Sequence, residues 1–193
     1  MRLSKDGLTP ISKAGMSDYF RDTLKGDFYN IIGTYDHYKK QYNLTLDTGS
    51  DSTSDTISFN ENVRGWTSFK SFIPESGVSM AGDYYTFKEG RLWKHHITPR
   101  NNFYGTAYTS KITAVFNDVY SSVKNFNTLN YDGDSGWYCN SIITDYENGT
   151  VSEFIEKEGK HFNYIKGIYP GYIDTSSFTF QGIGTASNIQ YNI

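Results

Sequence analysis

The sequence predicts a mainly β fold of antiparallel strands, arranged in propeller-like blades or a sandwich, with one short N-terminal helix. The first observation is residue choice, because 16 Ile and 17 Tyr stand against 7 Leu, and β-branched and aromatic residues suit a pleated sheet. The second is the alternation of short apolar runs with turn residues. Aromatic residues also reach 17% of the 193-residue chain, too much ring surface for a disordered segment to expose.

The one convincing helix candidate covers residues 17–25. Ser17 can cap its first turn, Phe20 and Leu24 share one face at a spacing of four, and Gly26 follows as a stop. Everything before it reads as an N-terminal arm, residues 1–16.

Strand-like runs follow the helix at short intervals. In the first half they are residues 28–35, 41–46, 56–59, 65–73, 78–80, 84–87 and 91–96. The first two are predicted to form a hairpin, and residues 47–55, which are only Asp, Thr, Ser and Gly, to form a solvated loop. Such closely spaced strands are typical of a propeller blade or a sandwich meander.

The second half continues in the same way without an obvious sequence repeat. Its strand candidates are residues 112–116, 123–131, 137–145, 150–155, 161–166 and 177–181. The Asn148-Gly149 pair between two of these runs is a strong hairpin signal. No linker rich in Pro or Ser divides the halves, so the sequence predicts one structural domain over residues 17–193.

Charge and cysteine usage exclude several classes of function. A net charge of −3 gives no positive field for a polyanion, which disfavours nucleic-acid binding through phosphate contacts. The single cysteine, Cys139, excludes an intrachain disulfide framework and a CxxC site. No apolar run has the length of a secretory signal or a membrane span, so we expect neither.

The Asp47-Thr48-Gly49 segment after an apolar run is similar to the catalytic loop of aspartic proteases. That chemistry needs two carboxylates sharing one proton. Only one such segment occurs here, so an exposed turn is the favoured interpretation.

Asp132, Asp134 and Gly136 resemble the start of a calcium-binding loop. The twelfth position of that loop, which should be acidic, is Ile143. A plain turn is therefore favoured over a metal site.

The histidines offer no clear metal or catalytic pattern. His95 and His96 are adjacent on a predicted strand, so their side chains should point to opposite faces. His37 and His161 lie far from them in sequence. We expect all four to pack on sheet surfaces and Cys139 to lie in the core.

Aromatic residues could form a sugar-stacking platform, although aromatics of a sheet more often belong to a core or an interface. The candidates are Tyr84, Tyr85, Trp93, Phe103, Tyr104 and Trp137. No residue is assigned a catalytic, cofactor-binding or metal-binding role, no cofactor is expected, and no enzymatic activity is predicted.

Several stretches resemble segments of virion structural proteins from tailed double-stranded DNA phages, with crAss-like and related marine phages as the most similar group. They are residues 17–22, 33–46, 59–61, 65–75, 85–95, 124–131, 153–160 and 162–165. The resemblance is to the C-terminal portion of longer tail proteins of the muzzle or nozzle type.

The resemblance implies a structural subunit that assembles with copies of itself, in a ring or tube, and with other phage tail proteins. Genomic DNA would be a partner only in transit through the exit channel. The implied location is the virion, in the phage tail, after synthesis in the host bacterial cytoplasm. A host-surface or glycan-binding module of a phage tail is the alternative.

Overall fold

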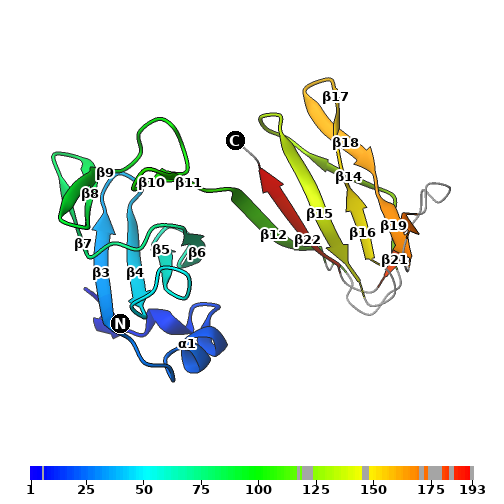
Figure 1. The fold of residues 1–193 in the computed structure, drawn as a ribbon. Coiled ribbons are helices and arrows are strands. Elements are labelled where there is room, and N and C mark those ends of the chain that lie inside the picture. The colour runs from blue at the N-terminus through cyan, green and yellow to red at the C-terminus, as the bar shows by residue number, and fades with distance from the viewer. Residues whose placement is uncertain are drawn as a thin grey trace. The chain divides into compact units, whose positions relative to one another are not determined.

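The computed structural model describes residues 1–5, 7–116, 118, 124–144, 148–169, 172–173, 180–182 and 185–191. These residues are mainly β, as predicted, and the strand pairs among them are antiparallel. They form two compact units, an N-terminal unit of residues 1–108 and a C-terminal unit of residues 109–193 (Figure 1). The predicted organisation, an arm followed by one domain over residues 17–193, stays a prediction. The division into two compact units does not test whether the units fold together.

The N-terminal unit is built mostly from short strands joined by tight turns. Its described elements are β1 (Arg2–Ser4), β2 (Gly7–Thr9), η1 (Ile11–Lys13), α1 (Ser17–Thr23), β3 (Asn30–Asp36), β4 (Gln41–Asp47), β5 (Asp55–Asn60), β6 (Gly65–Lys70), β7 (Ser76–Met80), β8 (Asp83–Lys88), β9 (Arg91–Lys94), β10 (Asn102–Phe103) and β11 (Thr106–Ala107).

The centre of this unit is the four-stranded sheet β3-β4-β5-β6. Because side chains alternate along a strand, β4 and β5 present Leu46, Ile57 and Phe59 on one face. The opposite face carries mostly Thr, Ser and Asn side chains, and those at its centre are buried too. Both faces must therefore be covered by other elements.

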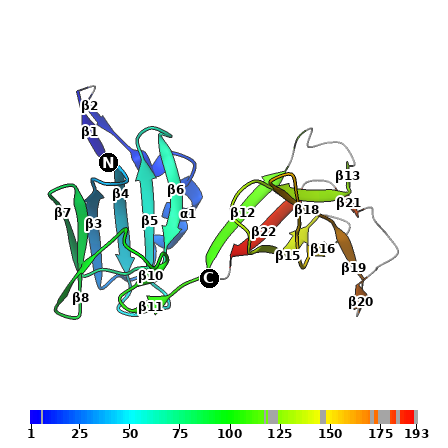
Figure 2. The ribbon, with the colours of Figure 1, turned by 90° about the horizontal axis from the view of Figure 1, so that it is seen from above.

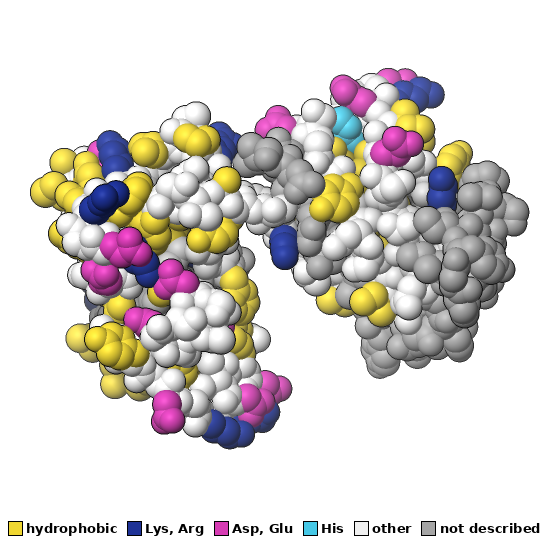
Figure 3. Space-filling view, in the orientation of Figure 1, with side chains coloured by type: hydrophobic (Ala, Val, Ile, Leu, Met, Phe, Trp, Pro, Cys, Tyr) yellow, Lys and Arg dark blue, Asp and Glu magenta, His cyan; other side chains and the backbone are white. Residues whose placement is uncertain are grey.

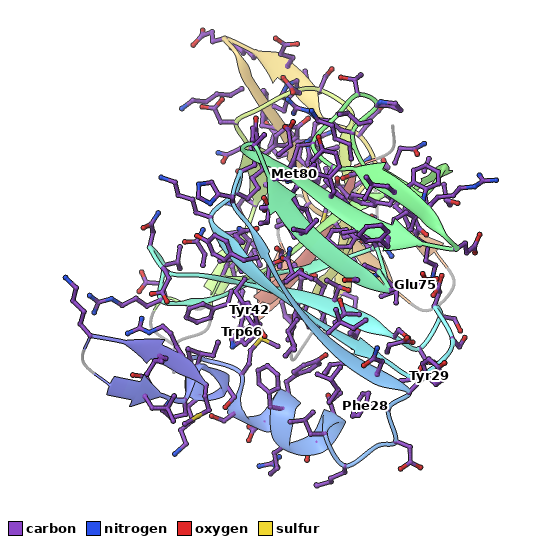
Figure 4. All side chains as sticks on the ribbon, turned by 90° about the vertical axis from the view of Figure 1, so that its left-hand side faces the viewer. Phe28, Tyr29, Tyr42, Trp66, Glu75 and Met80 are labelled. Atoms are coloured by element: carbon purple, nitrogen blue, oxygen red, sulfur yellow. The ribbon has the colours of Figure 1, made fainter. Side chains whose placement is uncertain are left out.

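Helix α1 and the N-terminal segment cover the apolar face. Phe20 packs on Trp66 with ring centroids 5.0 Å apart, and Tyr19 packs edge-on against Phe69 at 5.6 Å. The Trp66 indole donates to the carbonyl of Ile11 at 3.0 Å, which ties residues of the predicted arm to the sheet. Figure 4 shows α1 and Trp66 on the same side of the sheet.

The predicted helix is present but shorter, and its start differs. It spans Ser17–Thr23, with Met16 at the N-cap position and no capping side-chain hydrogen bond, so the predicted cap at Ser17 is wrong. Burial of Phe20 against the sheet stabilises this short helix in place of a cap.

The three-stranded sheet β7-β8-β9 covers the polar face. Tyr84 and Thr86 of β8 point inward and are fully buried. At the edge of the central sheet, the Ser79 hydroxyl donates to the carbonyl of Tyr35 at 2.8 Å and accepts from the amide of His37 at 2.9 Å. β7 therefore runs beside β3, as Figure 2 shows, and the unit has three layers.

The C-terminal unit contains a six-stranded sheet in the order β12-β22-β15-β16-β19-β20 and two smaller sheets, β14-β18-β17 and β13-β21. Its described strands are β12 (Ser110–Phe116), β13 (Lys124–Phe126), β14 (Thr128–Tyr131), β15 (Trp137–Ile143), β16 (Asn148–Val151), β17 (Ile155–Lys157), β18 (Lys160–Tyr164), β19 (Lys166–Tyr169), β20 (Tyr172–Ile173), β21 (Phe180–Gly182) and β22 (Thr185–Tyr191).

The core of the C-terminal unit contains Cys139, Ile142, Val151 and Ile165. Strand β15 has an irregular register after Cys139. Such a bulge lets side chains three positions apart face the same way, so both Cys139 and Ile142 are buried. The prediction that Cys139 lies in a core is confirmed.

Several predicted boundaries differ from the structure. The long run 65–73 ends as a strand at Lys70, and 123–131 is interrupted at Asn127, whose carbonyl accepts the amide of Ile165 at 3.0 Å. Asn148 and Gly149 lie in β16 and pair with Ile143 and Ile142 of β15, so the two strands pair as predicted but these two residues are not the turn. The predicted strand 177–181 lies mostly outside the described residues.

No sheet among the described residues closes on itself, and the propeller-like or sandwich arrangement stays a prediction. Within the described part of the chain, no helix has the length and apolar character needed to cross a membrane.

Core packing in the N-terminal unit predicts a large stability cost for Leu46→Ala. Leu46 is 1% exposed, and such truncations in a packed core cost about 2–5 kcal/mol. The matched control is Leu3→Ala, because Leu3 is 81% exposed. Urea unfolding followed by tryptophan fluorescence measures both, and similar losses in the two variants would contradict the core assignment.

Candidate functional site

The densest group of titratable side chains lies between the central sheet and β7-β8-β9. Asp36, at the end of β3, is buried and contacts His96, with 2.7 Å between Oδ2 and Nε2. Its other carboxylate oxygen accepts the amide of Lys39 at 3.0 Å. The Tyr38 ring stacks on His96 at 4.8 Å. The β3–β4 turn thus holds His96 from two sides.

A second set of hydrogen bonds lies deeper in the same layer. The Thr86 hydroxyl contacts His95 Nε2 at 2.7 Å and the Tyr104 hydroxyl at 2.9 Å. The Tyr84 hydroxyl contacts Thr34 at 2.8 Å and so joins β8 to the central sheet. We refer to Thr34, Asp36, Tyr38, Tyr84, Thr86, His95, His96 and Tyr104 as the polar cluster.

The two adjacent histidines do not point to opposite faces, so this prediction is wrong. Strand β9 ends at Lys94, and His96 has a φ of 61° in the left-handed region, which breaks the alternation of a strand. The rings of His95 and His96 lie 6.2 Å apart. The turn after β9 therefore brings both into one cluster.

Burial controls the protonation of the deeper groups. It lowers the pKa of His95 from 6.5 to about 4, with the charge of His96 acting in the same direction and Asp36 opposing both. Burial also raises the pKa of Tyr84 and of Tyr104. At neutral pH these three side chains are uncharged and act as hydrogen-bonding groups.

The chemistry of the cluster favours a structural role. A histidine with an aspartate partner can serve as a general base when a nucleophile lies within hydrogen-bonding distance. His95 contacts the Thr86 hydroxyl, and His96 contacts Asp36. Thr86 is fully buried, so its hydroxyl cannot meet a substrate from solution. The hydrogen bonds join β3, β8 and the segments after β9, so they hold the two sheets together.

The Asp47-Thr48-Gly49 segment forms a turn, as favoured from the sequence. The Asp47 carboxylate accepts the amide of Gly49 at 2.8 Å and the hydroxyl of Ser54 at 3.2 Å. Gly49 has a φ of +85°, which suits glycine. Asp47 thus stabilises its own loop between β4 and β5.

The other residues considered from the sequence lie apart from the polar cluster. Asp132 and Asp134 are exposed between β14 and β15, and no group of possible metal ligands occurs in the described parts of the chain. His161 is buried and stacks on Tyr131 at 4.6 Å, whereas His37 is exposed.

The predicted aromatic platform does not form as one open surface. Tyr84 is fully buried, and Phe103 packs near His95 and Phe72 at centroid distances of 5.7 and 5.2 Å. Trp93 packs edge-on against Tyr104 at 5.6 Å. Tyr85 and Trp137 are partly buried elsewhere.

Comparison with known proteins points to one group. Residues 98–167 match the family model described as the crassvirus muzzle protein C-terminal domain. The chain is also 28% identical over 102 residues to the muzzle protein of Bacteroides phage crAss001, which covers 52% of this chain and 7% of that protein. The predicted resemblance to muzzle proteins of crAss-like phages is confirmed, and the aligned region is a small part of a much longer relative.

The buried His95 predicts a loss of stability in acid. Between pH 6.5 and 4 the unfolded chain takes up a proton at this histidine that the folded chain does not. The free energy of unfolding should therefore decrease as the pH is lowered from 6.5 to 4, by about 3 kcal/mol from this group. His95→Gln should remove this part of the slope. Urea unfolding at several pH values tests it with the exposed His37→Gln as control, and equal slopes in His95→Gln and wild type would contradict it.

Proposed function

We propose that this chain is a structural subunit of a phage tail, of the muzzle type, and that it has no enzymatic activity. The observation that carries the proposal is the match of residues 98–167 to the muzzle C-terminal domain. This segment includes the core residues Cys139, Ile142, Val151 and Ile165 of the C-terminal unit. The resemblance to a virion protein therefore falls on residues that build a folded unit.

The subunit would assemble with copies of itself and with other tail proteins around the genome-exit channel. Exposed apolar side chains support such contacts, since contiguous apolar patches commonly mark protein interfaces. The outer face of β7-β8-β9 carries Val78, Met80, Phe87 and Leu92, each 40–57% exposed. Figure 3 shows hydrophobic side chains gathered over these strands.

The charge of the chain is compatible with DNA that passes without being retained. The net charge is −3. Retention of DNA depends on Lys and Arg contacts with many phosphates, and a mildly acidic subunit offers no excess of such contacts. Genomic DNA would thus be a partner only in transit, and the protein would act mechanically.

The alternative, a glycan-binding module, has less support in the structure. Each of the six aromatic residues considered for sugar stacking is buried or half-buried. Such stacking needs an accessible ring face.

Quantitative mass spectrometry of gradient-purified virions tests the proposal. We expect peptides of this chain in tailed particles at a fixed ratio to the capsid protein, and their loss from tailless heads of the same lysate. Absence from tailed particles, or equal abundance in tailless heads, would overturn the assignment to the tail.

A further inference from the structure

Strand β12 occupies one end of the six-stranded sheet in the C-terminal unit. It pairs with β22 in continuous register, from Ser110 opposite Tyr191 to Phe116 opposite Thr185. On its other side the described residues provide no strand partner. Figure 1 shows β12 as the outer strand beside β22.

Within its own residues, all of them described, β12 lacks the sequence features that usually prevent an edge strand from pairing with another chain. Proteins protect edge strands with prolines, bulges, several charges or a covering segment. β12 has no proline and a single charged residue, Lys111, and its register with β22 has no shift. The two edge strands of the central sheet in the N-terminal unit differ from β12. Strand β6 has a bulge, and Ser79 of β7 bonds to the backbone of β3 near its end.

The large apolar side chains of β12 are accessible. Ile112, Val115 and Phe116 are 48%, 71% and 46% exposed. Ile112, Ala114 and Phe116 share one face of the strand, and Lys111, Thr113 and Val115 share the other. An added strand would therefore find backbone hydrogen-bonding groups along residues 111–116 and apolar contacts on both faces.

We propose that β12 pairs antiparallel with β12 of a second copy of this chain, about a two-fold axis at Ala114. Antiparallel pairing places residues of the same face opposite each other. Ile112 then lies opposite Phe116 of the second copy, Thr113 opposite Val115, and Ala114 opposite Ala114. The two six-stranded sheets become one continuous sheet.

The register selects a second copy as the partner because the strand is complementary to itself. Large apolar side chains face each other in two symmetric pairs, β-branched residues face each other on the opposite side, and the smallest residue lies on the axis. Lys111 is the one charged residue of β12 and lies off the axis, so it does not meet Lys111 of the second copy. Centring the pair on Thr113 or Val115 would instead place Ile112 or Phe116 opposite Ala114.

Disulfide trapping tests the axis directly. Opposed residues of an antiparallel pair have Cα atoms roughly 4.5–5.5 Å apart, which suits a disulfide. Ala114→Cys should therefore form a covalent dimer under mild oxidation. Lys111→Cys is the control. Position 111 is exposed, but in this register it lies far from position 111 of the second copy, so this variant should stay uncrosslinked. The native Cys139 is fully buried and should not interfere.

Charge exchange tests the register without a covalent bond. Ile112→Lys should weaken dimerisation about tenfold, because two apolar cross-strand pairs are lost. Adding Phe116→Glu to the same chain should restore it, since the two substituted side chains carry opposite charges and face each other twice across the axis. Ile155→Lys, at an exposed isoleucine of β17 in the same unit, is the matched control and should leave the dimer unchanged. Sedimentation equilibrium measures the dissociation constants, and circular dichroism confirms folding.

Three results would overturn the inference. They are a wild-type chain that stays monomeric over the whole concentration range, a dimer that Ala114→Cys does not trap, and a dimer weakened by Ile155→Lys but not by Ile112→Lys. The inference does not depend on a place in the phage tail, because the purified chain is measured alone. A failure here leaves the virion experiment unaffected.

Discussion

The N-terminal unit depends on the need to satisfy buried hydroxyl and amide groups on one face of its central sheet. Thr45, Thr56 and Ser58 are almost inaccessible to water, and a buried polar group without a partner costs about 1–3 kcal/mol. Thr45 and Thr56 bond to each other at 2.8 Å, while Tyr84 reaches across to Thr34 at 2.8 Å. The layer that buries this face must therefore also be polar where it meets the central sheet, and β7-β8-β9, the turn after β9 and the polar cluster meet that need.

Local features of the fold could be predicted from the sequence, because they depend on neighbouring residues. The β3–β4 hairpin, the solvated loop after Asp47 and the short helix near Phe20 all follow from turn chemistry and periodicity. The end of β6 at Lys70 and the break at Asn127 could not be predicted. The break at Asn127 depends on a backbone hydrogen bond from Ile165, which is distant in the chain.

The polar cluster shows the limit of sequence reasoning about sites. Asp36 and His96 are 60 positions apart, and no motif joins them. The adjacent pair His95 and His96 was visible in the sequence, but the prediction of opposite faces assumed that the strand continues through both. The left-handed backbone at His96 ends the alternation and turns both rings into one cluster. By contrast, the resemblance to muzzle proteins did not require the fold, because it depends on residue identities along the chain, and some of the segments that carry it lie within the matched residues 98–167.

The buried position of Cys139 allows local opening of the C-terminal unit to be followed through the reactivity of its thiol. The thiol is fully buried within the C-terminal unit, and it is the single cysteine of the sequence. A reagent such as an aromatic disulfide can react with it only when that unit opens, so the labelling rate at high reagent concentration reports the opening rate of the six-stranded sheet. The opening of the C-terminal unit can thus be measured without an added label, and the N-terminal unit, which contains no cysteine, does not contribute to the signal.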